Sequence, residues 1–335
     1  MMDKANLERK PQWPLNTGYG PRTTAEEVIG NLDLNGKTAI VTGGYADLGL
    51  EVSRVLAKAG ARIIVPARSL QKAEAAVASI PGVELAELDL ADPASIDRFA
   101  HSFVRSGRPL HILVNCAGIM ATSEQRDGRG YELQFATNHL GHFQLTARLW
   151  PALERANGAR VVSVSSGGHR LGGINFEDPN FWSQPYDKWK AYGQSKTANA
   201  LFAQELDKKG AAHHVRAFSV HPGTIVTDLS RHLSDDEMKA MGALDELGQR
   251  TFTKMTSDHK TIPEGAATIV WCAVSKQLYG KGGVYCQNVD IAPPVPKDRI
   301  HEPGIPGVCP WAMDIQAAER LWQLSEKLTG ASFQI

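Results

Sequence analysis

The sequence contains few cysteines, and no two of them form a CxxC pair. The four are Cys116, Cys272, Cys286 and Cys309, widely separated in a chain of 335 residues. A density this low is typical of a reducing cytosol and disfavours a disulfide scaffold. The sequence also shows no His, Cys and acidic residues at metal-ligand spacing, so we expect no metal site.

The chain has no excess of either charge and no long apolar run. Lysine plus arginine number 36, as do aspartate plus glutamate. Without a basic excess, nothing points to nucleic acid or an anionic membrane as a partner. No window approaches the roughly 18 apolar residues of a membrane span. The N-terminus is polar and unlike a signal peptide, so we expect a cytoplasmic protein.

What the sequence does contain is a regular alternation of short apolar segments and helical segments. Strands are predicted at 38–42, 61–67, 83–90, 111–115, 159–166, 215–223 and 282–286, with helices between them, including long ones around 131–155 and 192–208. Strands that are apolar throughout are buried on both faces, as in parallel sheets covered by helices. The sequence therefore predicts the α/β class, with a Rossmann-type doubly wound parallel sheet of about seven strands in a single domain.

The segments that flank this pattern differ from it. Residues 1–35 are rich in Pro, Gly and Asn until Thr24 and Glu27, whose spacing predicts a capping box and a short helix. We assign 1–35 to an N-terminal extension, 36–290 to the sheet domain and 291–335 to a C-terminal extension. The C-terminal extension contains an amphipathic helical pattern, PWAMDIQAAERLWQLSEKL.

The turn after the first strand, TGGYADLG, has two of the three glycines of a dinucleotide-binding turn. Gly43 and Gly49 fit the outer positions, whereas Asp47 stands at the middle one. A carboxylate about 4 Å from a phosphate would cost roughly 1–4 kcal/mol. Asp47 could instead be a simple N-cap, so the turn alone leaves both interpretations open.

The pattern Y-x-x-x-K occurs twice within PYDKWKAYGQSK. Tyr186 precedes Lys190 by four residues, and Tyr192 precedes Lys196 by four. At this spacing both side chains share one helix face, where the ammonium can lower the pKa of the phenol. Tyr186 lies beside Pro185, before the predicted helix, so we favour the second pair as the chemical one.

Seven segments together resemble the short-chain dehydrogenase/reductase family over roughly 36–290. They are TGGYADLG, LDLAD, NCAG, NHLGHF, VVSVSSGGH, YGQSK and HPGTIVT. NHLGHF and SSGGH are similar to the branch of retinol dehydrogenases, protochlorophyllide reductases and the WW-domain-containing oxidoreductase. The resemblance implies four catalytic residues, Asn138, Ser166, Tyr192 and Lys196. It also implies that His139, His142 and His169 have packing or loop roles.

In this resemblance Tyr192 exchanges the proton, Lys196 lowers its pKa together with the oxidised nicotinamide, Ser166 holds the substrate oxygen, and Asn138 holds a relay water. The cofactor-binding residues it implies are Gly43, Tyr45, Asp47, Leu48, Gly49, Arg68, Asp89, Leu90, Asn115, Ala117, Gly118, Tyr192, Lys196, Pro222, Gly223 and Thr227.

The residues after the second strand favour NADP(H) over NAD(H). NAD enzymes commonly place a carboxylate there for the ribose hydroxyls, whereas an arginine suits a 2′-phosphate. Here the strand ends at Ala67 and Arg68 follows it, so the carboxylate is missing and a guanidinium is present. The alternative is that Arg68 is an ordinary surface residue at the start of a loop.

Apolar side chains near the predicted site suggest a bulky apolar or aromatic substrate. The segment 228–262 is predicted to be a substrate lid, with Leu229, Leu233, Met238 and Met241 at near-helical spacing. It could equally be a helix packed on the body. The segment 170–190 adds five aromatic residues that could line the pocket rim.

We therefore expect an NADP(H)-dependent oxidoreductase that acts on a small-molecule carbonyl or alcohol, as a homodimer or homotetramer. Two alternatives stay open: a catalytically silent cofactor-sensing or scaffold protein, favoured by Asp47, and a reductase of activated C=C bonds.

Overall fold

Eight strands form one sheet in the computed structural model, which describes residues 12–300, 302 and 305–335. They are β1 (Thr38–Val41), β2 (Arg62–Ala67), β3 (Val83–Glu87), β4 (Ile112–Asn115), β5 (Ala159–Val164), β6 (Val215–His221), β7 (Val284–Gln287) and β8 (Asp290–Ile291). Their spatial order is β3-β2-β1-β4-β5-β6-β7-β8. All neighbours are parallel except β7 and β8. The predicted doubly wound α/β fold is confirmed.

The antiparallel strand β8 is the part of the sheet that the sequence does not predict. Asn288 and Val289 form a two-residue turn between β7 and β8, and both have positive φ, 54° and 61°. Positive φ at both central residues is the geometry that matches the twist of a tight hairpin. Because β8 is only two residues long and its turn contains no glycine, its sequence carries no strand or hairpin signal.

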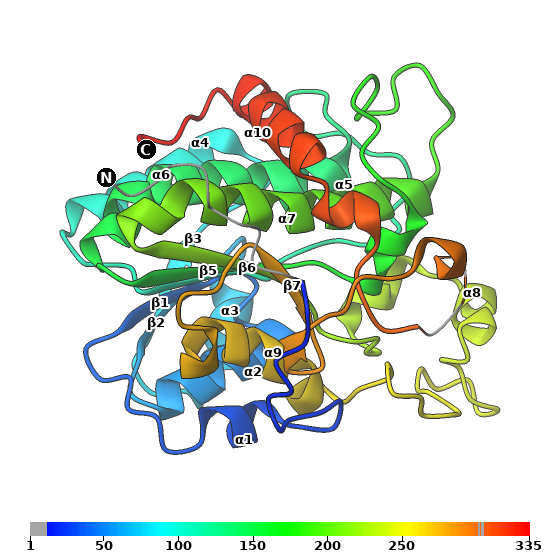
Figure 1. Ribbon diagram of the computed structural model, residues 1–335, viewed down its shortest axis with the longest axis horizontal. Coiled ribbons are helices and arrows are strands. Elements are labelled where there is room, and N and C mark those ends of the chain that lie inside the picture. The colour runs from blue at the N-terminus through cyan, green and yellow to red at the C-terminus, as the bar shows by residue number, and fades with distance from the viewer. Residues whose placement is uncertain (1–11, 301, 303–304) are drawn as a thin grey trace.

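Helices cover both faces of the sheet. The main ones are α1 (Ala25–Ile29), α2 (Asp47–Lys58), α3 (Leu70–Val77), α4 (Pro93–Arg105), α6 (Gly141–Arg155), α7 (Lys188–Gly210), α9 (Ile262–Val274) and α10 (Ile315–Thr329). Figure 1 shows α1, α2, α3 and α9 below the sheet and α4, α6, α7 and α10 above it. One apolar cluster fills each side, so the sheet is buried on both faces.

Local signals explain where two predicted helices begin. Thr24 forms the predicted capping box with Glu27 at the start of α1. The Asp187 side chain accepts bonds from the backbone N–H groups of Trp189 and Lys190, so α7 begins at Lys188. Tyr186 therefore lies outside the helix, as the sequence predicts.

The long helix predicted around 131–155 is interrupted. It consists of α5 (Leu133–Phe135), a π-helix at Ala136–Leu140 and α6. A π-turn inserts one extra residue per turn and turns the following side chains relative to a continuous α-helix. This interruption contains Asn138, one of the predicted catalytic residues.

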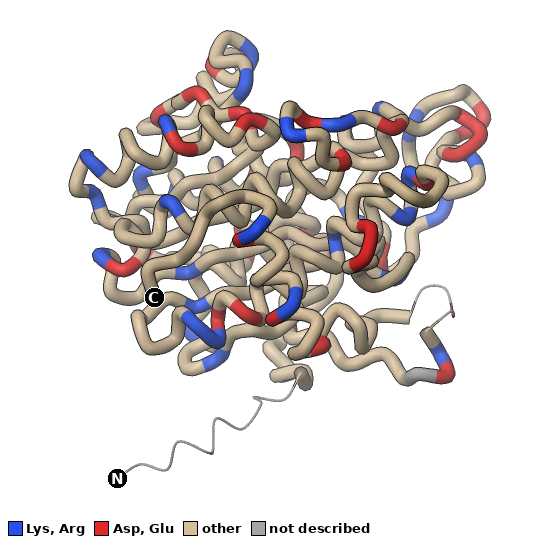
Figure 2. The backbone as a smooth tube through the Cα atoms, turned by 90° about the horizontal axis from the view of Figure 1, so that it is seen from above, with Lys and Arg blue, Asp and Glu red and all other residues tan. Residues whose placement is uncertain are grey.

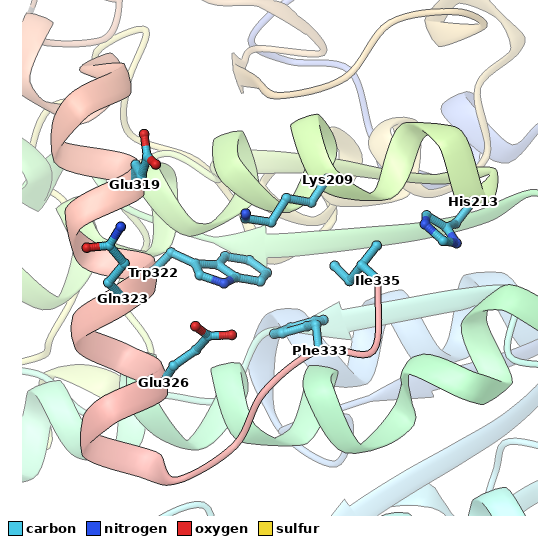
Figure 3. A pocket seen from close by; sticks show the side chains of 8 residues that line it. All are labelled: Lys209, His213, Glu319, Trp322, Gln323, Glu326, Phe333 and Ile335. Carbon is cyan, nitrogen blue, oxygen red and sulfur yellow. The ribbon is translucent and has the colours of Figure 1, made fainter.

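The C-terminal extension packs on the outer face of α6 and α7. Trp322 of α10 lies 5.1 Å from Phe143 and 6.1 Å from Phe202, measured between ring centroids, and 4.4 Å from Phe333 of the C-terminal tail. Figure 3 shows the groove of about 500 Å³ that α10, the tail and the end of α7 enclose. None of the predicted site residues lines this groove, so it is separate from the candidate active site.

The N-terminal extension covers the β7–β8 edge of the sheet. The Gln12 amide donates to the carbonyls of Tyr285 and Ala292, and its oxygen accepts from the N–H of Tyr285 at 3.0 Å. The Asp290 carboxylate accepts from the backbone N–H of Leu15 at 2.7 Å. These bonds occupy backbone and side-chain groups that an open sheet edge would expose.

Charged residues of both signs are interspersed along the chain, as Figure 2 shows. Among the described residues, no helix combines the length and apolar character needed to cross a membrane.

Candidate active site

The predicted site residues gather at the carboxyl ends of the parallel strands. Gly43 and Arg68 come just after β1 and β2, Asn115 ends β4, and Ser166 and Pro222 follow β5 and β6. The strand order reverses between β1 and β4. In open α/β sheets, ligands bind at this edge near such a reversal.

Tyr192 and Lys196 lie one turn apart on α7, and both are 4% exposed. The Lys196 Nζ lies 5.7 Å from the centroid of the Tyr192 ring and donates to the carbonyl of Val164 at 3.1 Å. Tyr186 differs: its hydroxyl bonds to Gln134 at 2.9 Å and to Glu132 at 3.1 Å. Only the second Y-x-x-x-K pair is therefore buried together at the strand ends.

The pKa of Tyr192 shifts opposite to the expectation from sequence. Burial raises the pKa of Tyr192 to about 12, although a hydrogen bond with Ser166 lowers it. Burial also lowers the pKa of Lys196 to about 8. The sequence predicts that Lys196 contributes much of a lowering for Tyr192. In the protein without a cofactor, burial is the largest cause of the Tyr192 shift, and the Lys196 ammonium donates to the Val164 carbonyl. A lowering by Lys196 together with the oxidised nicotinamide stays a prediction.

Ser166 reaches Tyr192 because two glycines follow it. The Ser166 Oγ accepts from the N–H of Gly168 at 3.1 Å and caps a 3₁₀ helix at Gly167–Leu171. A Cβ on Gly168 would lie 2.6 Å from the Tyr192 ring, so only glycine allows this approach. Ser165 donates its hydroxyl to the carbonyl of Lys196 at 2.7 Å, which is a structural role.

Asn138 is fully buried in the π-helix and bonded at both ends of its amide. Its Nδ2 donates to Ser195 Oγ and to the carbonyl of Ile119, both at 2.9 Å, and its Oδ1 accepts from the N–H of Ile119 at 2.9 Å. A Cβ on Gly118 would lie 3.1 Å from Asn138 Oδ1 and 3.6 Å from Lys196 Nζ. Gly118 therefore lets Asn138 and Lys196 flank the same loop.

The nucleotide turn has the backbone shape of a glycine-rich turn despite Asp47. Gly43 has φ 68°, and a Cβ on Gly49 would lie 2.2 Å from the Gly43 carbonyl oxygen. Asp47, the first residue of α2, has φ 46°, in the left-handed region that glycine favours and Asp tolerates. Burial raises the pKa of Asp47, while the backbone N–H of Asp228 lowers it. Tyr45 and Leu48 pack against the apolar cluster beneath the turn.

The remaining predicted cofactor residues separate into accessible and structural ones. Arg68 is exposed beyond β2, and no ion pair involves it within the described ranges. The Asp89 Oδ1 accepts from the N–H of Ala91 at 2.9 Å. Leu90 and Asn115 are buried, and Asn115 donates to Thr146 at 3.2 Å. Leu90 and Asn115 therefore have structural roles.

Ala117 and the loop after β6 shape the rest of the edge. The Ala117 N–H donates to Thr42 Oγ1 at 3.0 Å. Gly223, after Pro222, has φ 92°, and Thr227 caps the 3₁₀ helix Asp228–His232 by accepting from Leu229. These turns direct the chain into the predicted lid.

Two residues that sequence reasoning leaves outside the site support it. His142 bonds through Nε2 to Thr42 Oγ1 and through Nδ1 to the Asn138 carbonyl, both at 2.9 Å. Burial lowers the pKa of His142 to about 4, so it is neutral. Its position one turn after Asn138 is a signal that could have identified it. Tyr285 of β7 donates its hydroxyl to the Ser166 carbonyl at 3.1 Å, and no local pattern indicates that contact.

The predicted lid contains a short helix, α8 (Asp235–Ala240), over an apolar cluster. Leu233 and Met238 are buried there with Ala121 and Ala243, and Met120, Trp189, Val226, Leu244 and Phe252 pack against them. Met241, by contrast, is 40% exposed, so only part of the predicted apolar face is covered. The Trp189 ring meets the Tyr192 ring edge-on at 6.4 Å, so the cluster extends to Tyr192, the candidate catalytic residue.

Comparisons with known proteins agree with this arrangement. A family model described as short chain dehydrogenase matches residues 37–238. "Probable oxidoreductase" of Streptomyces lividans is 43% identical, covering 87% of this chain and 97% of that protein. Retinol dehydrogenase 12 of Homo sapiens is 35% identical, covering 91% and 90%. A crystal structure of an uncharacterized protein from Mycobacterium paratuberculosis is 33% identical, with a TM-score of 0.70, covering 92% of this chain and 98% of that one.

Proposed function

The chain belongs to the short-chain dehydrogenase/reductase family and is an oxidoreductase of that family. On that premise we propose that it transfers hydride between NADP(H) and a carbonyl or alcohol substrate, with Tyr192 as the proton donor and acceptor. The observation that carries this proposal is the meeting of Tyr192, Ser166 and Lys196 at the carboxyl ends of the strands.

The residues at this edge fit a nicotinamide dinucleotide. Gly43 and Gly49 keep the backbone free of side chains where the pyrophosphate would approach the first turn of α2. Lys196 would bond a ribose hydroxyl, and the Pro222–Thr227 loop would contact the carboxamide. When bound, the nicotinamide gives or takes the hydride and, when oxidised, adds a positive charge beside Tyr192.

The other residues of the site would orient the substrate and transfer the proton. Ser166 Oγ donates to the substrate oxygen and orients it toward the Tyr192 hydroxyl. Tyr192, with its pKa of about 12, holds its proton at neutral pH, so it is ready to protonate an alkoxide formed by hydride addition. Lys196 stabilises the phenolate that results, and Asn138 holds the Ile119 backbone that borders this path.

We propose NADP(H) rather than NAD(H) on the ground of Arg68. Its guanidinium is exposed beyond β2, where the adenosine ribose of a dinucleotide lies in this fold class. An arginine binds a phosphate with two parallel hydrogen bonds. The neighbouring Ala67 offers no carboxylate for ribose hydroxyls.

We propose a bulky apolar or aromatic substrate because of the cluster under α8. Met120, Trp189 and Val226 are partly buried at the edge of this cluster, and the Trp189 ring lies 6.4 Å from the Tyr192 ring. Met side chains adapt to irregular ligands. The Lys188 ammonium pairs with Glu237 of α8 at 2.6 Å, which ties the lid to the start of α7.

Cytoplasmic location and assembly as a homodimer or homotetramer stay predictions. The outer face of α6 and α7 is covered by α10 and Phe333 of the same chain.

The test is equilibrium binding of NADPH and NADH, followed by tryptophan fluorescence, and then a turnover screen of aromatic aldehydes, ketones and enones. We expect tighter binding of NADPH and turnover of carbonyl compounds. Turnover of enones alone would indicate a C=C reductase. No binding of either cofactor would overturn the proposal and favour a silent protein.

A further inference from the structure

The peptide group between Ser166 and Gly167 is held at both of its polar atoms. The Gly167 N–H donates to His221 Nδ1 at 2.9 Å. The Ser166 carbonyl accepts from His169 Nδ1 at 2.8 Å and from the Tyr285 hydroxyl at 3.1 Å. His169 Nε2 accepts from the Cys309 N–H, so its proton is on Nδ1. The orientation of this peptide fixes where Ser166 Oγ lies.

His221, the last residue of β6, connects this peptide to a carboxylate. Because its Nδ1 accepts from Gly167, its proton is on Nε2, which donates to Asp258 Oδ1 at 3.0 Å. The His221 side chain is only 6% exposed, and a Cβ on Gly167 would lie 3.3 Å from its ring. The imidazole is therefore a closely fitted bridge with one defined tautomer.

Asp258 closes the base of the lid. Its Oδ2 accepts from the Thr224 hydroxyl at 2.6 Å, and its carbonyl accepts from the Thr224 N–H at 2.7 Å. Gln287 of β7 donates to Oδ1 at 3.3 Å. Burial raises the pKa of Asp258, but the bonds from His221 and Thr224 outweigh this effect and hold that pKa well below its usual range. The segment between Thr224 and Asp258 contains α8, so both ends of the lid meet at this carboxylate.

We propose that His221 and Asp258 are positioning residues that couple the base of the lid to the Ser166–Gly167 peptide. This inference rests on the proposed function in one respect, namely that Ser166 holds the substrate oxygen. When the lid base is intact, Asp258 orients His221, and His221 holds the Gly167 N–H. Loss of either side chain frees the peptide and moves Ser166 Oγ away from the Tyr192 hydroxyl.

Two substitutions at His221 separate positioning from packing. His221→Gln can retain both bonds, since its amide oxygen can accept from Gly167 and its amide N–H can donate to Asp258. His221→Leu removes both bonds while keeping an apolar side chain of similar bulk. If only packing matters, both variants should behave alike.

Hydrogen–deuterium exchange tests the coupling without any substrate. We expect Asp258→Ala and His221→Leu to speed exchange of the Gly167 amide about tenfold or more, and His221→Gln to restore much of the protection. Asp178→Ala is the matched control, because the Asp178 carboxylate clamps the Trp182 and Ser183 amides in another loop. Unchanged Gly167 exchange in Asp258→Ala would overturn the proposal, even if His221→Leu fails to fold.

Turnover of phenanthrenequinone with NADPH provides the second readout. We expect Asp258→Ala and His221→Leu to lower kcat about ten- to a hundredfold, and His221→Gln to recover most of the loss. Equal losses in His221→Leu and His221→Gln would overturn the positioning role. If the unaltered protein turns over no carbonyl compound, the proposed function fails, and the exchange experiment still decides the coupling.

Discussion

The Lys196 ammonium lies 5.7 Å from the centre of the Tyr192 ring and donates to the Val164 carbonyl at 3.1 Å. The two groups are thus near each other, and burial moves each pKa toward its neutral form, to about 12 for Tyr192 and about 8 for Lys196, so near pH 7 the phenol keeps its proton and Lys196 is still mostly an ammonium. In the proposed reaction, a cationic nicotinamide would shift the balance toward the phenolate. Proton transfer is thereby linked to the redox state of the cofactor.

Lys196→Met should stabilise the cofactor-free protein near neutral pH. The unfolded chain holds the lysine proton up to about pH 10.5, whereas the folded protein releases it near pH 8, so stability rises between these values. Removing the amine should raise the free energy of unfolding by on the order of 1–3 kcal/mol at neutral pH, and the gain should shrink toward pH 10. The Val164 carbonyl retains its bond from Asn199 at 3.1 Å.

Urea unfolding at several pH values measures this difference, with the exposed Lys190→Met as control. If Lys196→Met is less stable than the unaltered protein at neutral pH and the difference does not change with pH, then burying the Lys196 ammonium does not destabilise the fold.

Asp47→Gly should bind NADPH more tightly. Glycine adopts the φ of 46° at this position without strain, and replacing Asp47 removes a carboxylate from the turn. Asp47→Asn should give a similar gain if charge is the cause, because Asn also tolerates this conformation. Repulsion of roughly 1–4 kcal/mol corresponds to about five- to a thousandfold in Kd. Equal or weaker binding by both variants would show that the phosphates lie elsewhere.

Arg68→Ala should weaken NADPH binding about ten- to a hundredfold and leave NADH binding nearly unchanged, since the lost bonds are charge-assisted bonds to a 2′-phosphate. Arg62→Ala is the control, because Arg62 lies exposed at the opposite end of β2 and pairs with Glu84 at 3.5 Å. Parallel losses for both cofactors in Arg68→Ala would argue against a role in NADP recognition. Isothermal titration gives both Kd values.

Trp322→Ala should destabilise the protein by about 3–5 kcal/mol, the usual cost of deleting a buried aromatic side chain. Trp322 is 5% exposed and packs on Phe143, Phe202 and Phe333. The exposed Gln323→Ala on the same helix is the control, with a change near zero. Equal stability of the two variants would show that α10 contributes little to the fold.

The sheet and most helices could be predicted because their signals are local. Buried parallel strands are continuous apolar runs, and Thr24 and Glu27 form their capping box within one turn. The choice between Tyr192 and Tyr186 was also local, since Asp187 starts α7 after Tyr186. These interpretations needed no knowledge of distant contacts.

The features that escaped prediction depend on distant partners or on backbone geometry. Asp258 meets His221 across 37 positions, and Tyr285 meets Ser166 across 119. The π-helix around Asn138 leaves no compositional trace. The raised pKa of Tyr192 follows from burial, which a spacing pattern does not reveal. Sequence therefore indicated which residues to examine, but not the bonds that hold them or the charge they carry.

Turnover of Tyr192→Phe beside Tyr186→Phe tests the central claim most directly, with NADPH, phenanthrenequinone and a parallel measurement of NADPH binding. The Tyr186 hydroxyl bonds to Gln134 and Glu132 outside the site, so Tyr186→Phe should keep most of its turnover. Tyr192→Phe should lose about 10²- to 10⁴-fold in kcat while its Kd for NADPH stays the same. Undiminished turnover in Tyr192→Phe would contradict its role as the proton donor.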